Sequence, residues 1–137
     1  MRSKREEERA RFDRLVQEAW LAIPAGFRRR VDNVAIVAED EPGPDDLRRA
    51  RCLRGSTLLG LYHGIPLTRR TSSYGLVLPD KISIYRGPIE RMARNERDLA
   101  RIVRDTLWHE LGHYFGMDER QVRQAARRWR RTEGSRQ

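Results

Sequence analysis

The chain has 137 residues, the length of one ordinary domain, and we expect a single domain over residues 1–137 with its core at about 12–130. No run approaches the roughly 18–20 consecutive apolar residues that span a bilayer, and the opening MRSKREEERARF lacks the apolar segment of a signal peptide. We therefore expect a soluble, cytoplasmic protein without a membrane partner. Cys52 is the one cysteine, which excludes an intramolecular disulfide and a cysteine-based zinc site. Any metal must rest on His, Asp and Glu.

The formal net charge is +9, and 27 of the 29 basic residues are arginine. Such a surplus attracts anionic partners, nucleic acid among them, through its summed field. Runs of charge are more often solvated faces, so the charge indicates a direction of attraction without identifying a partner.

The first half of the chain predicts a helix followed by strands and loops. Apolar residues recur at helical spacing over 3–23, until Pro24 ends the pattern. Residues 31–38 alternate as a buried strand would, and the acidic, Pro- and Gly-containing stretch at 39–46 predicts an exposed loop. Residues 53–70 are expected to be irregular or short-stranded.

A second strand is predicted at 81–86, ended by Gly87 and Pro88. It fits the core of a sheet, and alternatively an edge on which an extended peptide adds.

Two helices are predicted in the last third. Asn95 can cap a helix that begins at Glu96 and ends at Gly116. Asp118 can cap a final helix, with Gln121 as its capping-box partner.

The segment His109-Glu110-Leu111-Gly112-His113 carries the clearest chemical pattern, HExxH. Histidines four apart on a helix are separated by about 40° and roughly 6 Å of rise, so both imidazoles can reach one ion. Glu110 would then act on water beside the metal instead of binding it. An exposed helix that carries two histidines by chance is the alternative. The predicted helix, the use of two of the three histidines and the glycine three residues after His113 favour a zinc site.

The motif His109-Glu110-x-x-His113-x-x-Gly116 resembles the zincin signature. In addition, LLGLYHGIPLTRR, LPDKISIYRGPIERM and RDTLWHELGHYFGMDE resemble, in this order and spacing, small bacterial zincin-like metallopeptidases once classified as a domain of unknown function. The resemblance spans about residues 12–129. It implies an α+β minimal zincin fold, in which a small mixed sheet packs against the HExxH helix between N- and C-terminal helices. It also implies a carboxylate third ligand after the glycine.

The third ligand is left open by the sequence. In the family's register it is Glu119, ten residues after His109, although the family more often has Asp or Ser near this point. Asp118 is the alternative, but its capping role already explains it. His63 and Glu133 are weaker candidates, because one lies in a Gly-flanked loop and the other near the end of the chain.

The leading functional hypothesis is a zinc-dependent metallopeptidase that cleaves a peptide or protein substrate, with Zn²⁺ at His109, His113 and a carboxylate, and Glu110 as general base. Tyr62, Tyr85 and Tyr114 could supply an oxyanion donor, and none is assigned. The alternative is a zinc-stabilised binding or regulatory module whose peptidase activity is latent or lost. A basic nucleic-acid-binding protein is less favoured, because no nucleic-acid motif accompanies the arginines.

Overall fold

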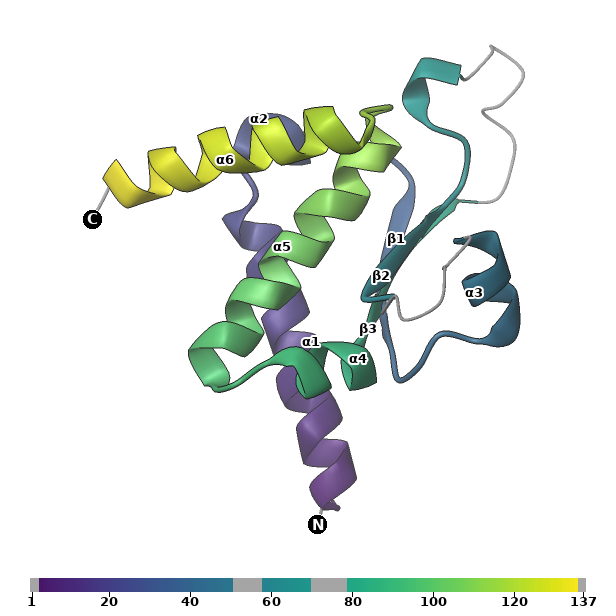
Figure 1. The fold of residues 1–137 in the computed structure, drawn as a ribbon, viewed down its shortest axis with the longest axis vertical. Helices are drawn as coiled ribbons and strands as arrows, with labels where there is room; N and C mark the ends of the chain where they lie inside the picture. Colours follow the sequence, from purple (N-terminus) through teal and green to yellow (C-terminus); the bar gives the residue numbers. More distant parts are fainter. Residues whose placement is uncertain (1–2, 51–57, 70–78, 136–137) are drawn as a thin grey trace.

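The computed structural model describes residues 3–50, 58–69 and 79–135, with the backbone alone for residues 69 and 129–135. Cys52 and the side chain of Glu133 therefore lie outside the described part. Figure 1 shows an α+β arrangement, as the sequence predicted. Within the described ranges, none of the helices is long and apolar enough to cross a lipid bilayer. The elements are α1 (Lys4–Ala22), α2 (Ala25–Arg28), β1 (Val34–Glu39), α3 (Pro44–Arg49), β2 (Gly60–His63), a 3-10 turn (Leu67–Arg69), β3 (Asp80–Tyr85), α4 (Arg86–Met92), α5 (Glu96–Tyr114) and α6 (Glu119–Ser135).

The sheet has three strands in the order β1-β3-β2. β1 runs parallel to β3, whereas β2 runs antiparallel to it and places Tyr62 opposite Ile82. β3 is central, and its alternating residues Ile82 and Ile84 on one face, Ser83 and Tyr85 on the other, are all 0% exposed. The prediction of a strand at 81–86 is confirmed with its bounds shifted by one residue, to Asp80–Tyr85. Its central position makes it core sheet and leaves the edges to β1 and β2.

The site-bearing helix α5 packs between α1 and the sheet. Figure 1 shows α1 and α5 together on one side of the sheet and α3 on the other. Each fully buried aliphatic side chain contributes about 1.5–3 kcal/mol, so this core holds α5 firmly in place. The shared core consists of side chains at most 7% exposed, among them Phe12, Val16, Ala19, Ile23, Ile82, Ile84, Leu99, Val103, Leu107 and Leu111.

Both ends of α5 are fixed by local hydrogen bonds. At the start, the Asn95 side chain accepts from the Asp98 amide at 2.8 Å, as the sequence predicted. At the other end the Gly116 amide donates to the His113 carbonyl and the Met117 amide donates to the Gly112 carbonyl, each at 2.9 Å. This pair of bonds is a Schellman motif, and it requires the left-handed φ of +86° that Gly116 adopts. The chain therefore reverses sharply after α5.

The prediction of a buried strand at 31–38 differs from the structure in two respects. The strand begins at Val34, and none of its residues is fully buried, because β1 is an edge strand that pairs with β3 alone among the described strands. Its inward residues Val34, Ile36 and Ala38 are only partly buried against the core.

Three short helices were missed from the sequence: α2, which follows Pro24 directly, α3 and α4. The expected loop at 39–46 contains the start of α3, where Pro44 occupies the first turn and the Asp46 side chain accepts from the Gly43 amide at 3.3 Å. β3 ends at Tyr85, just before Gly87 and Pro88, and these two residues lie in the first turn of α4, which the sequence did not predict. A proline is tolerated there because first-turn amides have no partner within the helix.

Replacing Gly116 by Ala should destabilise the protein by more than about 1 kcal/mol. The alanine would have to keep the left-handed φ of Gly116, and its Cβ would lie next to the Thr68 side chain. Gly26→Ala is the matched control, because that position lies in α2 with no atom within 4 Å of a Cβ, and its stability should stay equal or rise slightly. Urea denaturation of both variants measures the difference. Equal stabilities would contradict the role assigned to the turn.

Candidate metal centre

α5 presents His109 and His113 on one partly exposed face. The neighbouring Leu107 and Leu111 are 0% exposed and fix the rotation of the helix. The two imidazoles lie edge to face with ring centroids 4.9 Å apart, and their side chains are 35% and 30% exposed. Both rings are therefore held by a rigid helix and remain accessible.

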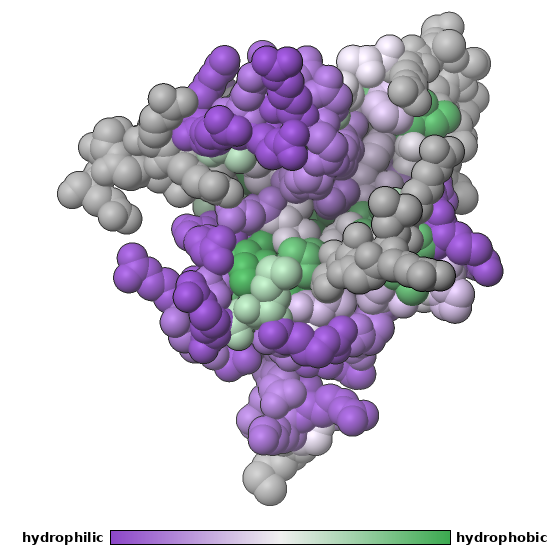
Figure 2. Space-filling view, in the orientation of Figure 1, coloured by the Kyte–Doolittle hydropathy of each residue, from purple (hydrophilic) through white to green (hydrophobic). Residues whose placement is uncertain are grey.

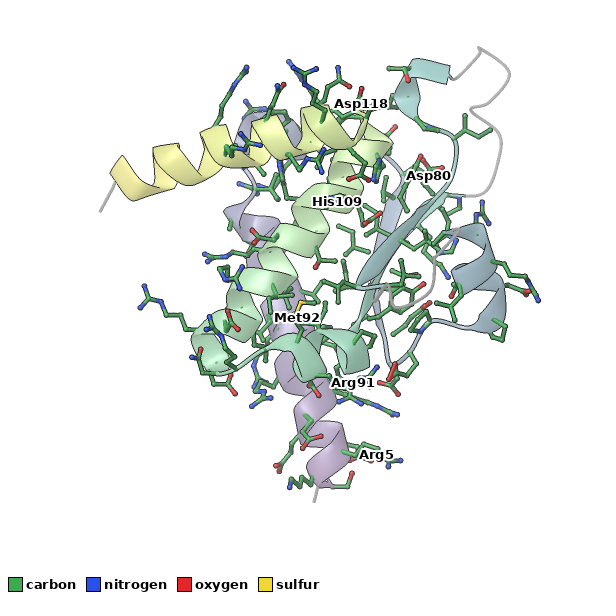
Figure 3. The ribbon with its side chains drawn as sticks, viewed as in Figure 1. Arg5, Asp80, Arg91, Met92, His109 and Asp118 are labelled. Atoms are coloured by element: carbon green, nitrogen blue, oxygen red, sulfur yellow. The ribbon has the colours of Figure 1, made fainter. Side chains whose placement is uncertain are left out.

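Glu119, the first residue of α6, brings a carboxylate to the same place. Its Oε1 lies 3.1 Å from Nε2 of His109 and 3.1 Å from Nε2 of His113. The two Nε2 atoms lie 3.2 Å apart. The three atoms thus form a nearly equilateral triangle. The labelled His109 and Asp118 in Figure 3 show where α5 and the start of α6 meet.

The triangle fits zinc. Bonds of about 2.0–2.1 Å in a tetrahedron place ligand atoms about 3.3 Å apart, close to the distances found here. Two neutral histidines and one carboxylate are also a usual donor set for a catalytic zinc, which keeps its fourth position for water or substrate. The Glu119 side chain is 57% exposed, so solvent reaches this corner of the site.

Glu110 lies beside the triangle, on the buried side of α5. It is 7% exposed, and its Oε1 accepts a hydrogen bond from the Tyr62 amide of β2 at 3.0 Å. Burial raises the pKa of Glu110 above its usual value. The rise is opposed by the nearby His109 and His113 and by the hydrogen bond from the Tyr62 amide. The carboxyl group is therefore oriented by the sheet, and its burial favours the protonated form more than in an exposed glutamate.

The structure separates the candidates for the third ligand. It brings Glu119 together with His109 and His113. Asp118 instead caps α6: its Oδ1 accepts from the Gln121 amide at 2.8 Å, and Gln121 Oε1 accepts from the Asp118 amide at 2.9 Å. This capping box is the one that the sequence predicted.

His63 belongs to a different set of contacts. Its Nε2 lies 3.5 Å from Ser83 Oγ and 4.0 Å from Asp46 Oδ1. Side chains alternate along β2, so His63 points to the opposite face of the sheet from Tyr62, which contacts Tyr114 of α5. Burial lowers the pKa of His63.

The tyrosines considered as oxyanion donors are engaged elsewhere or face away. The Tyr62 hydroxyl donates to Asp80 Oδ2 at 2.6 Å. The Tyr114 hydroxyl accepts from the Asp32 amide at 3.1 Å. Tyr85 lies on the sheet face turned away from α5, and burial raises its pKa.

Sequence reasoning missed the contribution of β2. Gly60 lets this strand approach α5 closely, since a Cβ there would lie 2.7 Å from Thr106 Cγ2 and 3.4 Å from Glu110 Cγ. A glycine inside a short strand often marks such an approach, and this was the available signal. The hydrogen bond from the Tyr62 amide to Glu110 joins residues 48 positions apart, so no local sequence pattern predicts it.

Comparison with known proteins agrees with this geometry. The family model of zincin-like metallopeptidases matches residues 31–129, and the chain belongs to that family. A solved structure, a conserved hypothetical protein from Thermo thermophilus, is 27% identical, covers 78% of this chain and 92% of its own, and has a TM-score of 0.53. A search of curated proteins finds no match. The family resemblance predicted from the sequence is therefore confirmed.

The roles of the two neighbouring carboxylates can be separated by substitution. Glu119→Ala should weaken zinc binding at least about 100-fold, because even the loss of a supporting contact outside the ligands costs 10–100-fold. Asp118→Ala should cost about 1 kcal/mol of stability, because it removes the cap of α6. The same free energy corresponds to about fivefold in affinity, so zinc binding should weaken by no more than that. Competition with a chromophoric chelator and urea denaturation measure the two effects. The reverse ranking of zinc affinities would make Asp118 the ligand.

Proposed function

We propose that this protein is a zinc-dependent peptidase in which His109, His113 and Glu119 hold the metal and Glu110 is the general acid and base. The observation that carries the proposal is the triangle of ligand atoms, 3.1–3.2 Å on each side, next to a buried carboxylate. Membership of the zincin-like metallopeptidase family supports it.

The proposed reaction is hydrolysis of a peptide bond. Zinc, when bound, lowers the pKa of a coordinated water to about 7 and polarises a carbonyl group. Glu110 accepts the proton as the water oxygen forms its bond to the carbonyl carbon. It returns that proton to the amide nitrogen as the carbon–nitrogen bond breaks. The Tyr62 amide holds Glu110 Oε1, so Oε2 is the oxygen that carries the proton.

The substrate backbone has a place to bind beside this site. In the described part of the chain, β2 pairs with β3 on one side, and the Tyr62 amide points from its other side toward Glu110. An extended peptide added along this edge would form main-chain hydrogen bonds and pass the metal. β2, and not the strand predicted at 81–86, is therefore the edge on which we propose that a peptide adds.

Glu110→Gln should bind zinc as the wild type does and lose activity about 10²–10⁴-fold, because the amide cannot take up the proton. Cleavage of a denatured protein or of a peptide mixture, followed by mass spectrometry, measures activity, and metal analysis measures zinc. Glu96→Gln is the matched control, since Glu96 lies in the first turn of the same helix with its side chain 67% exposed. Its activity should be unchanged.

A zinc-loaded wild type that cleaves nothing would contradict the proposal. It would favour the alternative of a zinc-stabilised binding module, with which the openness of the site is compatible.

A further inference from the structure

Three arginines lie next to one another on the solvent side of α6. Arg120, Arg123 and Arg127 are separated by three and four residues, so each is a neighbour of the next on the helix surface. All three are exposed, whereas Val122, on the side that faces Gly112 of α5, is 2% exposed. Figure 2 shows hydrophilic side chains gathered over the described part of α6, in the upper part of the view. We call these three arginines the basic stripe.

The stability of α6 does not explain the basic stripe. Like charges at these spacings repel one another, and the positive charges of Arg120 and Arg123 lie near the helix start, where the helix dipole disfavours them. None of the three forms an ion pair with a carboxylate in the described part of the chain. Many arginines of the other described surfaces do have such partners, among them Arg9, Arg11, Arg86, Arg91, Arg94 and Arg101. The basic stripe is therefore available to an anionic partner.

The basic stripe begins at the candidate metal centre. Arg120 directly follows Glu119, whose Oε1 lies 3.1 Å from Nε2 of both histidines. Arg123 follows Glu119 by four residues and so lies one turn further along the same flank of α6. At about 1.5 Å of rise per residue, Arg123 and Arg127 lie about 6 Å and 12 Å from Glu119 along the helix. A ligand that follows the stripe thus reaches the metal centre at one end.

The order of charges along this surface fits a polypeptide. At its metal end the stripe adjoins the exposed carboxylates of Asp118 and Glu119. A nucleic acid carries a phosphate at every step, so a strand on the arginines would also place phosphates against these carboxylates. A polypeptide can be acidic over the stripe and uncharged next to it. An extended chain advances about 3.3 Å per residue, so about three residues match the stripe.

We propose that the basic stripe binds an acidic segment of the polypeptide substrate, with Asp or Glu about two to four residues from the bond that is cut. Arg123 and Arg127 are the residues that determine this preference. The inference rests on the proposed peptidase function, and the experiments below separate the failure of one from the failure of the other.

The first test measures binding without turnover. Zinc-loaded Glu110→Gln protein is titrated against two fluorescent decapeptides that differ only in three consecutive glutamates, which are glutamines in the second peptide. The glutamate peptide should bind about tenfold more tightly at low salt, because three exposed ion pairs each contribute a small factor. The difference should largely disappear at about 0.5 M salt, where exposed charges are screened.

Charge variants locate the effect. Adding Arg123→Gln and Arg127→Gln together should reduce the preference for the glutamate peptide to about twofold or less. Arg5→Gln with Arg14→Gln is the matched control, because it removes the same net charge from exposed positions of α1. Figure 3 shows the labelled Arg5 at the far end of the molecule from His109. The control should keep the full preference, and circular dichroism checks that both double variants are folded.

The second test is the cleavage pattern of zinc-loaded wild type on a mixed peptide library. Asp and Glu should be enriched two to four residues from the cleaved bond, on one side of it. Replacing these acids by amides in a well-cleaved peptide should raise KM about tenfold and leave kcat nearly unchanged, because the arginines contact the substrate away from the reacting atoms. The Arg123 and Arg127 variant should show the same KM for both peptides.

The outcomes discriminate between the two proposals. Equal binding of the two decapeptides, or a preference that the Arg5 and Arg14 control loses equally, overturns the assignment of the basic stripe and leaves the peptidase function standing. Binding of a ten-nucleotide oligothymidine that is tighter than that of the glutamate peptide and depends on Arg123 and Arg127 also overturns it, in favour of nucleic acid. Absence of any cleavage by zinc-loaded wild type overturns the peptidase function. In that case binding that depends on the two arginines still supports the stripe as a site for acidic polypeptides.

Discussion

The reversal of the chain at Gly116 is the constraint on which the candidate metal centre depends. α5 can supply two ligand atoms from one face, but the third has to come from a residue that follows the end of this helix. The left-handed turn at Gly116 sends the chain back, and α6 begins three residues later with Glu119 beside the imidazoles. α6 can cross so closely because Gly112 has no side chain, since a Cβ there would lie 2.5 Å from Val122 Cγ2. Gly112 and Gly116 are therefore structural requirements of the site.

The core and the site share a single helix. The buried side of α5 anchors it against α1 and β3, and its exposed side carries the two histidines. Glu110 lies at the boundary between these sides, where burial raises its pKa and the Tyr62 amide fixes its orientation. The sheet therefore contributes to the chemistry through main-chain atoms. Any change that moves β2 away from α5 therefore alters the hydrogen bond that orients Glu110.

Features determined by residues near one another in the chain could be predicted from the sequence. The caps of Asn95 and Asp118 and the end of α5 at Gly116 depend on hydrogen bonds that span three to five residues, and all three are found. α2, α3 and α4 were missed because four to seven residues are too few to show a helical period. The edge position of β1 depends on its pairing with a strand more than forty residues away. The meeting of Glu119 with both histidines followed from family resemblance, and spacing alone left Asp118 open.

The origin of Glu119 in α6 has a thermodynamic consequence. In the described part of α6, Val122 is 2% exposed, and Ala125 and Ala126 are partly buried against the core. An ion bound by one carboxylate from α6 and two imidazoles from α5 would cross-link the two helices. By mass action, such a ligand at 100 times its dissociation constant adds about 2.7 kcal/mol to the folded state. Metal availability would then set how firmly the C-terminal helix is docked, so a chelator would act on the shape of the molecule as well as on its chemistry.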